Sequence, residues 1–322
     1  MPTAPTKAAG LADGSSSATP WPRRSEHPDP ARRMTFYLGI PPSAMPRVDV
    51  PTCVSVSALL RCGDRLPRAK APYLLDSGAY TMLRDHGGWT MFVEEYAATV
   101  YRLIDGLGHP PTAVAIPDWM CEPWIIHGGL HRGHHYVGTD LDVPIHQALT
   151  TGAYVHLNNE HTGVPWMPIL QGHRLHDYLD HIHQYARAGV DLTRAPLVGL
   201  GSVCARQGTA EIAAIVAAVR AAGIDRLHGF GVKTTGLHLY GPHLRSVDSY
   251  AWSKGARLRL PDCTHPGPCN NCIRYALAWR EHVLDALRHP HQTSLPLDFR
   301  NPTNPNVADT KHTTDTPRDR KA

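Results

Sequence analysis

The sequence predicts an α/β protein built as a (β/α)8 TIM barrel, and two observations lead to this fold class. First, five short apolar runs have the length and β-branched content of buried strands, and each ends in a small polar or glycine-containing signature. Second, stretches that can form helices lie between most of them, and alternating strands and helices imply a parallel sheet. The five runs are Tyr73–Tyr80, Ala113–Pro123, Trp166–Gly172, Leu197–Gln207 and Leu227–Val232.

Three further segments complete the expected strands. Phe36–Ile40 and Cys53–Leu59 come first, joined by a proline-rich connection, and Leu244–Trp252 comes last. Two of the expected helices end at a glycine just past the last turn, which is a stop signal. The expected helices are Phe92–Leu107, Asp142–Leu157, His176–Gly189, Glu211–Gly223 and Cys272–Leu287.

The 322 residues suit one barrel-sized domain, which we expect over residues 34–297. Residues 1–33 and 298–322 carry few large apolar side chains and cannot offset the entropy of ordering, so we expect disordered tails there. The chain has no run of about eighteen apolar residues and no signal-peptide core. We therefore expect a soluble, cytoplasmic protein without a membrane partner.

The chain is mildly basic, with a formal charge of +4, a pI near 8.7 and 22 histidines. This balance permits a polyanionic partner but does not require one. Basic residues near the expected strand ends are either phosphate contacts or ordinary surface charge. They are Arg206, Lys233, Arg245, Lys254 and Arg257.

Three aspartates follow expected strands at the places where a barrel builds its active site. They are Asp76, Asp118 and Asp248. Any one of them has an alternative role as a helix N-cap, because aspartate accepts hydrogen bonds from the first turn of a helix. Three at different strand ends, beside a Gln–Gly pair and two glycine-rich ends, favour a shared site.

Paired carboxyl groups are suited to glycosidic chemistry. One attacks the anomeric carbon and forms a covalent glycosyl ester, while the other manages the proton of the leaving group. A third carboxylate can accept hydrogen bonds from the N–H groups of a purine-like base, because an ionised carboxylate has only acceptors.

A cysteine cluster near the end of the chain indicates a metal site. Cys263, Cys269 and Cys272 supply three thiolates, and a structural zinc site needs a fourth ligand. His265 lies in the same loop, whereas His282 lies about three helical turns beyond the last cysteine, so we favour His265. We expect a structural zinc subdomain over residues 258–290; the alternative is a turn with free thiols.

Two other groups of residues have less specific signals. The histidine-rich connection His127–His135 is either a second metal site or, as we favour, a solvated connection. Cys121 and Cys204 adjoin site motifs but have no base nearby in sequence, so we expect them to pack rather than react.

Taken together, these motifs resemble the tRNA-guanine transglycosylase superfamily over roughly Thr35 to Leu287. DSGAY from Asp76 is similar to its DSGG[YF] motif, LQG to its VQG, VGLGSV to its glycine-rich GGLA segment and GFGV to its MGVG. Asp118 and SVDS, which contains Asp248, hold the places of its base-recognising and nucleophilic aspartates.

Several departures are closer to one branch of that superfamily, the DpdA family of deazapurine DNA modification. The first gap between the cysteines is wider than in the tRNA-acting enzymes, and DSYAWSKGAR replaces their DCVLPTR. PDWMCEP, GLGSVCARQ, GFGVK and NCxxYAxxWR also resemble the DNA branch. That branch exchanges guanine in DNA for a 7-deazaguanine.

The resemblance implies a role for each motif residue. Asp248 is the expected nucleophile and Asp76 the expected general acid and base, while Asp118 and Gln171 are expected to hold the base. The remaining residues expected to bind substrate are Ser77, Gly78, Gly172, Gly201 and Gly231.

The same resemblance implies the partners of the protein. They are double-stranded DNA, whose target base must leave the stack, and a 7-deazaguanine base similar to preQ0; helper proteins for DNA opening and a homodimer are compatible with it. Three alternatives stay open: the same exchange on tRNA, a metal-dependent barrel hydrolase, and a non-catalytic zinc protein that binds nucleic acid.

Overall fold

The computed structural model describes residues 34–256, residue 265 and residues 269–288. The two tails expected over residues 1–33 and 298–322 lie outside these ranges, as do Cys263 and Arg257. None of the helices in the described ranges combines the length and the apolar character needed to cross a membrane.

Within the described ranges, nine strands form one parallel sheet in the order β7-β4-β3-β2-β1-β11-β10-β9-β8. Every connection between sequential neighbours runs in the same direction along the sheet, as βα units require. The strands are β1 (Thr35–Gly39), β2 (Thr52–Ser55), β3 (Tyr73–Asp76), β4 (Ala113–Ala115), β7 (Trp166–Met167), β8 (Ile169–Leu170), β9 (Val198–Leu200), β10 (Leu227–Gly229) and β11 (Ser246–Ser249).

The two ends of this sheet are parts of one extended segment. β7 and β8 are separated only by Pro168, which has no backbone N–H and so interrupts the ladder. Its carbonyl still accepts a hydrogen bond from the N–H of Gly199 at 2.8 Å. Because β7 pairs with β4 and β8 with β9, this segment brings the edges of the sheet together. The predicted (β/α)8 barrel is confirmed.

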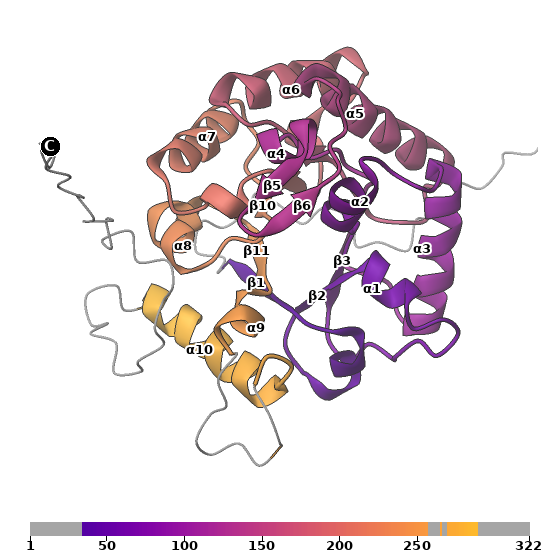
Figure 1. Ribbon diagram of the computed structural model, residues 1–322, viewed down its shortest axis with the longest axis vertical. Coiled ribbons are helices and arrows are strands. Elements are labelled where there is room, and N and C mark those ends of the chain that lie inside the picture. Colours follow the sequence, from indigo (N-terminus) through magenta and orange to yellow (C-terminus); the bar gives the residue numbers. More distant parts are fainter. Residues whose placement is uncertain (1–33, 257–264, 266–268, 289–322) are drawn as a thin grey trace, which may run out of the picture.

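Helices surround the strands, as Figure 1 shows. They are α1 (Val56–Leu60), α2 (Ala79–His86), α3 (Val93–Leu107), α4 (Pro123–His127), α5 (Val143–Glu160), α6 (Leu175–Arg187), α7 (Ala210–Ala221), α8 (Thr234–Tyr240), α9 (Ala251–Gly255) and α10 (Ile273–Arg288). Short 3-10 turns lie at η1 (Pro42–Arg47), η2 (Leu192–Arg194), η3 (Cys204–Arg206) and η4 (Gly241–His243). The expected helices are therefore confirmed, with ends shifted by a few residues.

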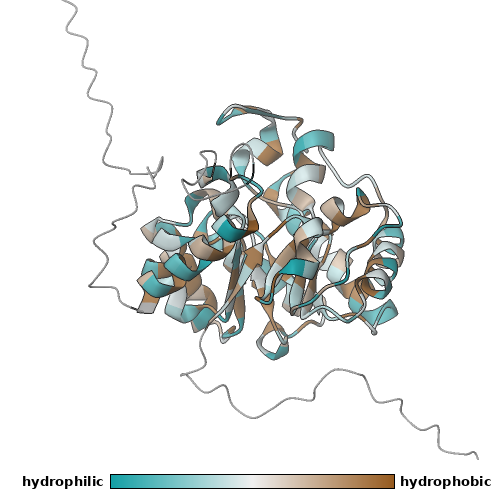
Figure 2. Cartoon of the chain, turned by 90° about the horizontal axis from the view of Figure 1, so that it is seen from below, coloured by the Kyte–Doolittle hydropathy of each residue, from teal (hydrophilic) through white to brown (hydrophobic). Residues whose placement is uncertain are grey.

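The barrel strands are apolar along most of their length because both of their faces are covered. Residues of β3, β4, β9 and β10 are almost entirely buried. In Figure 2 strands occupy the middle of the molecule, between helices that carry hydrophilic residues on their outer faces. At the C-terminal end of the chain, Trp279 of α10 packs edge-on against Phe36 of β1, with ring centroids 5.9 Å apart.

Two segments differ from the expectation. The apolar run Cys53–Leu59 is shared between a strand that ends at Ser55 and the short helix α1, in which Val56 and Leu59 are buried one turn apart. The histidine-rich connection is an antiparallel hairpin, β5 (Gly129–His131) with β6 (His134–Tyr136). The apolar pattern of the sequence predicted neither helix α1 nor the hairpin, because runs this short fit a strand and a helix equally well.

Candidate active site

The three aspartates lie at the carboxyl ends of barrel strands, as predicted. Asp76 is the last residue of β3, Asp118 follows β4, and Asp248 lies in β11. Burial, and then the negative charges of Asp248 and Asp118, raise the pKa of Asp76 to about 7. The N–H of Gly78 and the hydroxyl of Ser55 donate to Asp76 and oppose this rise. Asp76 therefore lies near enough to Asp248 and Asp118 for their charges to act on it.

Asp248 is held by groups from β10 and the loop that follows it. The N–H of Gly231 donates to Oδ1 of Asp248 at 3.0 Å. Nε2 of His228 lies 3.3 Å from the same oxygen, without the geometry of a hydrogen bond. Nδ1 of His228 meets the hydroxyl of Ser246 at 2.9 Å, and His228 is fully buried. Both of these contacts are made to Oδ1 of Asp248.

Gly231 reaches Asp248 because no side chain is present at this position. Its φ of 62° lies in the left-handed region, which glycine adopts at little cost. A Cβ atom there would lie 2.4 Å from the sulfur of Cys204. The sequence predicted Gly231 as a site residue, and the structure places its N–H on the carboxyl group of Asp248.

Asp118 is buried, and both of its oxygens accept hydrogen bonds from site residues. The hydroxyl of Ser77 donates to Oδ1 at 2.8 Å, and Nε2 of Gln171 donates to Oδ2 in a short contact. Burial raises the pKa of Asp118 to about 6 against these two hydrogen bonds, which lower it. A carboxylate oxygen can accept two hydrogen bonds, so Asp118 keeps acceptor capacity for a ligand. The predicted trio Ser77, Asp118 and Gln171 is thus a directly bonded unit.

The backbone of Gln171 is held by two side chains from the surrounding helices. Its N–H donates to Nδ1 of His181 at 2.9 Å, and its carbonyl accepts from Nε2 of Gln147 at 2.8 Å. Burial lowers the pKa of His181 to about 3, so its ring is neutral and its Nδ1 is available as an acceptor. Helices α5 and α6 therefore hold the backbone of Gln171 from both its N–H and its carbonyl.

Two residues that the sequence did not single out continue this unit. The hydroxyl of Ser202 lies 2.6 Å from Oε1 of Gln171 and 2.8 Å from Oε2 of Glu122, and it accepts from the N–H of Cys121 at 2.8 Å. Ser202 has a φ of 54°, a left-handed conformation that costs a non-glycine residue about 1 kcal/mol. In this conformation the hydroxyl of Ser202 lies between Gln171 and Glu122.

A hydroxyl has one proton, so Ser202 cannot donate to Gln171 and Glu122 at once. All contacts are satisfied when Glu122 is protonated, donates to Ser202, and Ser202 donates to Gln171. Burial raises the pKa of Glu122 to about 7, which favours this arrangement. Glu122, Ser202, Gln171 and Asp118 then form one continuous chain of hydrogen bonds at the ends of β4, β8 and β9.

Two glycines beside this chain of hydrogen bonds leave room for neighbouring side chains, because a Cβ atom at either position would collide with them. A Cβ at Gly201 would lie 2.3 Å from Nε2 of Gln171, so the glycine leaves room for the amide. The N–H of Gly201 donates to Leu170, and its carbonyl accepts from the hydroxyl of Tyr178 at 2.8 Å. Gly172 lies directly against Tyr178, whose ring a Cβ would approach to 3.0 Å.

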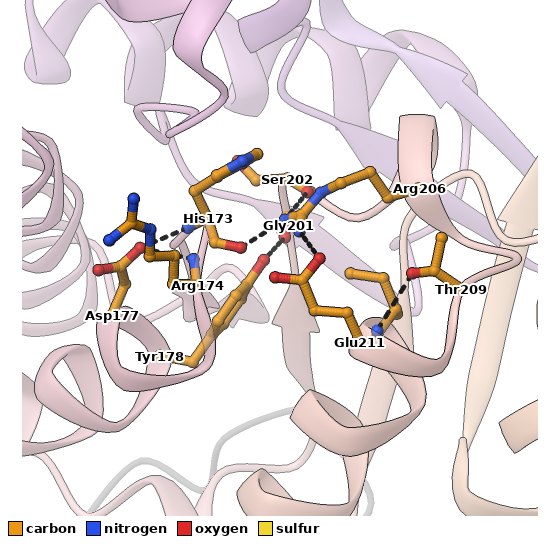
Figure 3. Close-up of polar contacts among 10 residues, drawn as sticks. His173, Arg174, Asp177, Tyr178, Gly201, Ser202, Arg206, Thr209 and Glu211 are labelled. Atoms are coloured by element: carbon orange, nitrogen blue, oxygen red, sulfur yellow. Dashed lines mark hydrogen bonds and ion pairs between the residues drawn. The ribbon is translucent and has the colours of Figure 1, made fainter.

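Arg206 connects the loops after β8 and β9, as Figure 3 shows. Its guanidinium donates to the carbonyl of His173 and to Glu211, both at 2.6 Å. The guanidinium of Arg206 therefore links the loop after β8 to the start of α7. Arg245 precedes β11 and so lies at the amino-terminal end of the barrel, away from the aspartates. Lys233 and Lys254 keep the predicted placement after strands.

Near the C-terminal end of the described chain, one group of side chains can hold a metal ion. The donor atoms of His265, Cys269 and Cys272 lie within 4.8 Å of one another. Among the described residues, His282 is not part of this group, and Cys263 lies outside the described ranges. The described histidines of His127–His135 form no such group either. Two thiolates and an imidazole are donors that suit zinc.

Fold and site together define a transglycosylase-like barrel, with carboxyl groups from several strand ends around a buried amide. The family model of DpdA, described as DeoxyPurine in DNA protein A, matches residues 32–311, and the chain belongs to this family. Membership in this branch of transglycosylase-like enzymes supports a transferase of DNA deazapurine modification, with DNA as its substrate. Among the curated proteins, none matches this chain.

Proposed function

We propose that this protein exchanges guanine in DNA for a 7-deazaguanine similar to preQ0, through a covalent aspartyl–glycosyl intermediate. The observation that carries the proposal is the pairing of Asp248, whose Oδ1 is fixed by Gly231, with the buried Asp76, whose pKa is raised to about 7. A fixed carboxylate beside a carboxyl group that holds its proton near neutral pH is the arrangement that displacement at a sugar carbon requires.

In the first half of the reaction, the carboxylate of Asp248 attacks C1′ of the target deoxyguanosine. The bond between C1′ and N9 breaks, and guanine leaves with the proton of Asp76. In the second half, the deazaguanine loses its N9 proton to Asp76 and attacks C1′, which releases Asp248. Atoms and charges balance, and two displacements retain the configuration at C1′.

Asp118 and Gln171 are proposed to hold the leaving and the entering base. Asp118 accepts from the N–H groups of the base. Ser202 contacts the side-chain amide of Gln171, and His181 and Gln147 hold its backbone. Unpaired donors of a buried base cost about 1–3 kcal/mol each, so this contact selects guanine-like bases. We propose that Ser77, Gly78, Gly172, Gly201 and Gly231 shape the same site.

Zinc is proposed as a structural ion at His265, Cys269 and Cys272, with Cys263 as the fourth ligand. The donor set fits, because a closed thiolate-rich site is typical of structural zinc. When bound, zinc would supply folding energy to the segment before α10 and no step of the reaction. The site lies in residues 258–290, which we propose as a subdomain of the barrel unit at 34–297.

The partner is proposed to be double-stranded DNA with the target base out of the stack. Helper proteins that open the DNA and a homodimer are compatible with this proposal. Nucleoside mass spectrometry of DNA and RNA, from cells with and without this protein, tests the proposal. We expect a deazaguanine deoxynucleoside in DNA that depends on the protein. A modified ribonucleoside in tRNA, with DNA unchanged, would overturn it in favour of the RNA-acting alternative.

A further inference from the structure

The β5–β6 hairpin projects from the end of the barrel that carries the aspartates. It follows α4, which begins five residues after Asp118, and it lies against α2, which begins three residues after Asp76. The hydroxyls of Tyr136 and Tyr80 meet at 2.9 Å, and the N–H of Val137 donates to the carbonyl of Arg84 at 3.0 Å. Figure 1 shows the hairpin in front of the barrel strands.

The two faces of the hairpin differ in their surroundings. On the inner face, Tyr136 is buried, and His131 stacks on Trp124 with ring centroids 3.9 Å apart and planes 4° apart. On the outer face, Leu130 pairs across the strands with His135. Leu130 is 78% exposed, and His135 is exposed as well. The hairpin is thus anchored firmly on one face and presents an apolar side chain to solvent on the other.

The tip of the hairpin has an unusual residue for its conformation. Arg132 and Gly133 form the two-residue loop, with φ of 49° and 79°. Positive φ at both positions is the type I′ geometry, in which asparagine, aspartate and glycine are favoured. An arginine there carries a conformational cost that asparagine would avoid, and its side chain is exposed. Both Arg132 and Leu130 are exposed, so neither side chain contributes to the packing of the barrel.

The charge of Arg132 at the hairpin tip is one of several that influence the Cys204 thiol. Desolvation by the surrounding protein raises the pKa of this thiol, although the residue reaches solvent; Lys233 and Arg132 act to lower it, and Asp248 and Glu122 act to raise it. Cys204 lies against Gly231, which donates to Asp248. The hairpin that carries Arg132 follows α4, at the end of the barrel where Asp118 and Asp248 lie.

We propose that the β5–β6 hairpin is the element that engages duplex DNA and opens it at the target base, an inference that rests on the proposed function. Leu130 enters the base stack in the space that the target guanine leaves, and His135 lies beside it. Arg132 contacts the phosphates that flank the extruded nucleotide. Apolar side chains that enter a base step with a basic neighbour on the backbone are a known physical means of unstacking DNA.

The experiment uses a duplex with 2-aminopurine next to one target guanine, whose fluorescence rises when stacking is lost. Two variants test the hairpin: Leu130→Ala, and Arg132→Asn, which removes the charge and keeps a residue suited to the turn. Leu149→Ala on α5 and Arg102→Asn on α3 remove an exposed leucine and an exposed arginine from the outer helices and serve as matched controls. Circular dichroism establishes that all four variants are folded.

We expect Leu130→Ala to bind the duplex but to lose most of the fluorescence rise and about tenfold or more in exchange rate on paired DNA, because unstacking a base step costs a few kcal/mol. On a duplex whose target guanine faces an abasic site, its exchange rate should return to that of the wild type. Arg132→Asn should weaken duplex binding. It should also reduce the magnitude of the negative slope of log affinity against log salt by about one, because one phosphate contact is lost.

Fluorescence and binding do not need the exchange reaction, so they test the hairpin even if exchange itself is not found. If wild type shows the fluorescence rise but no exchange, the hairpin stands and the proposed function fails. If both hairpin variants match their controls in affinity and fluorescence, or if Leu130→Ala is equally slow on the abasic duplex, the hairpin proposal is wrong. Tighter binding of a structured RNA than of duplex DNA would also overturn it.

Discussion

At the scale of single residues, the proposed reaction depends on the carboxylate of Asp248 and on the groups that hold it. Asp248→Asn keeps the shape of the side chain but removes the nucleophilic charge, so exchange should fall below detection while folding and DNA binding stay nearly intact. Burst and steady-state assays with radiolabelled base measure the loss. Full exchange by this variant would rule out Asp248 as the nucleophile.

His228 offers a related test, because it touches the carboxylate that we assign as nucleophile and not the substrate. His228→Asn removes the ring contact 3.3 Å from Oδ1 of Asp248. We expect kcat to fall about tenfold with little change in KM, as for a group that positions a catalytic residue without binding the ground state. A change confined to KM would show instead that His228 contributes to substrate binding.

If Asp76 is the general acid, as we propose, exchange depends on pH. In the proposed reaction Asp76 must be protonated to release guanine, and its pKa is raised to about 7. The exchange rate should therefore fall as the pH rises through about 7, when the acid loses its proton. A profile of kcat from pH 5 to 9 measures this limb, and Asp76→Asn should lower kcat by about 10²–10⁴-fold. A rate that keeps rising above pH 8 would contradict the assignment.

At the scale of elements, the cysteine cluster should stabilise the segment that leads into α10. Metal analysis should find about one zinc per chain, and Cys269→Ser should lower both zinc content and Tm. His265→Ala should do likewise, and more than His282→Ala, because only His265 joins the described group. Cys62→Ser is the matched control, since Cys62 lies outside the group. Active protein free of zinc would refute the structural role.

The apolar pattern of the sequence was sufficient to locate some of the elements and failed for others. Apolar runs such as those of β3 and β9 identify strands because both faces of a barrel strand are covered, and the polar residues after them must then lie at one end of the barrel. The pattern failed at Cys53–Leu59, where a strand and a helix share one run, and at the histidine-rich segment, whose hairpin has too few apolar residues to show alternation.

At the scale of the whole molecule, the buried carboxyl groups should affect stability as well as the reaction. The pKa of Glu122 is raised to about 7, so between its ordinary value and pH 7 the folded protein binds more protons than the unfolded chain. Stability contributed by this group is full at low pH and is lost as the pH rises through about 7. Asp76 and Asp118 act in the same direction, and the buried neutral His181 acts in the opposite one.

Glu122→Gln isolates this contribution, because glutamine keeps a donor for Ser202 and has no proton to lose. The free energy of unfolding of the variant, relative to wild type, should rise between pH 4.5 and 8 by up to about 3 kcal/mol. Urea unfolding at each pH measures the difference, with the exposed Glu160→Gln as the control. A difference that does not vary with pH would mean that Glu122 is ionised in the folded protein.

The sequence by itself determined the barrel, the strand ends that carry Asp76, Asp118 and Asp248, and the metal donors around Cys269, because these signals are local runs of neighbouring residues. Tertiary structure alone decided which distant groups meet. Ser202 and Glu122 are 80 positions apart and His228 and Asp248 are 20 apart, yet each pair is in contact. Strand register and barrel closure at Pro168 set these pairings, and no local pattern of side chains records a register between strands.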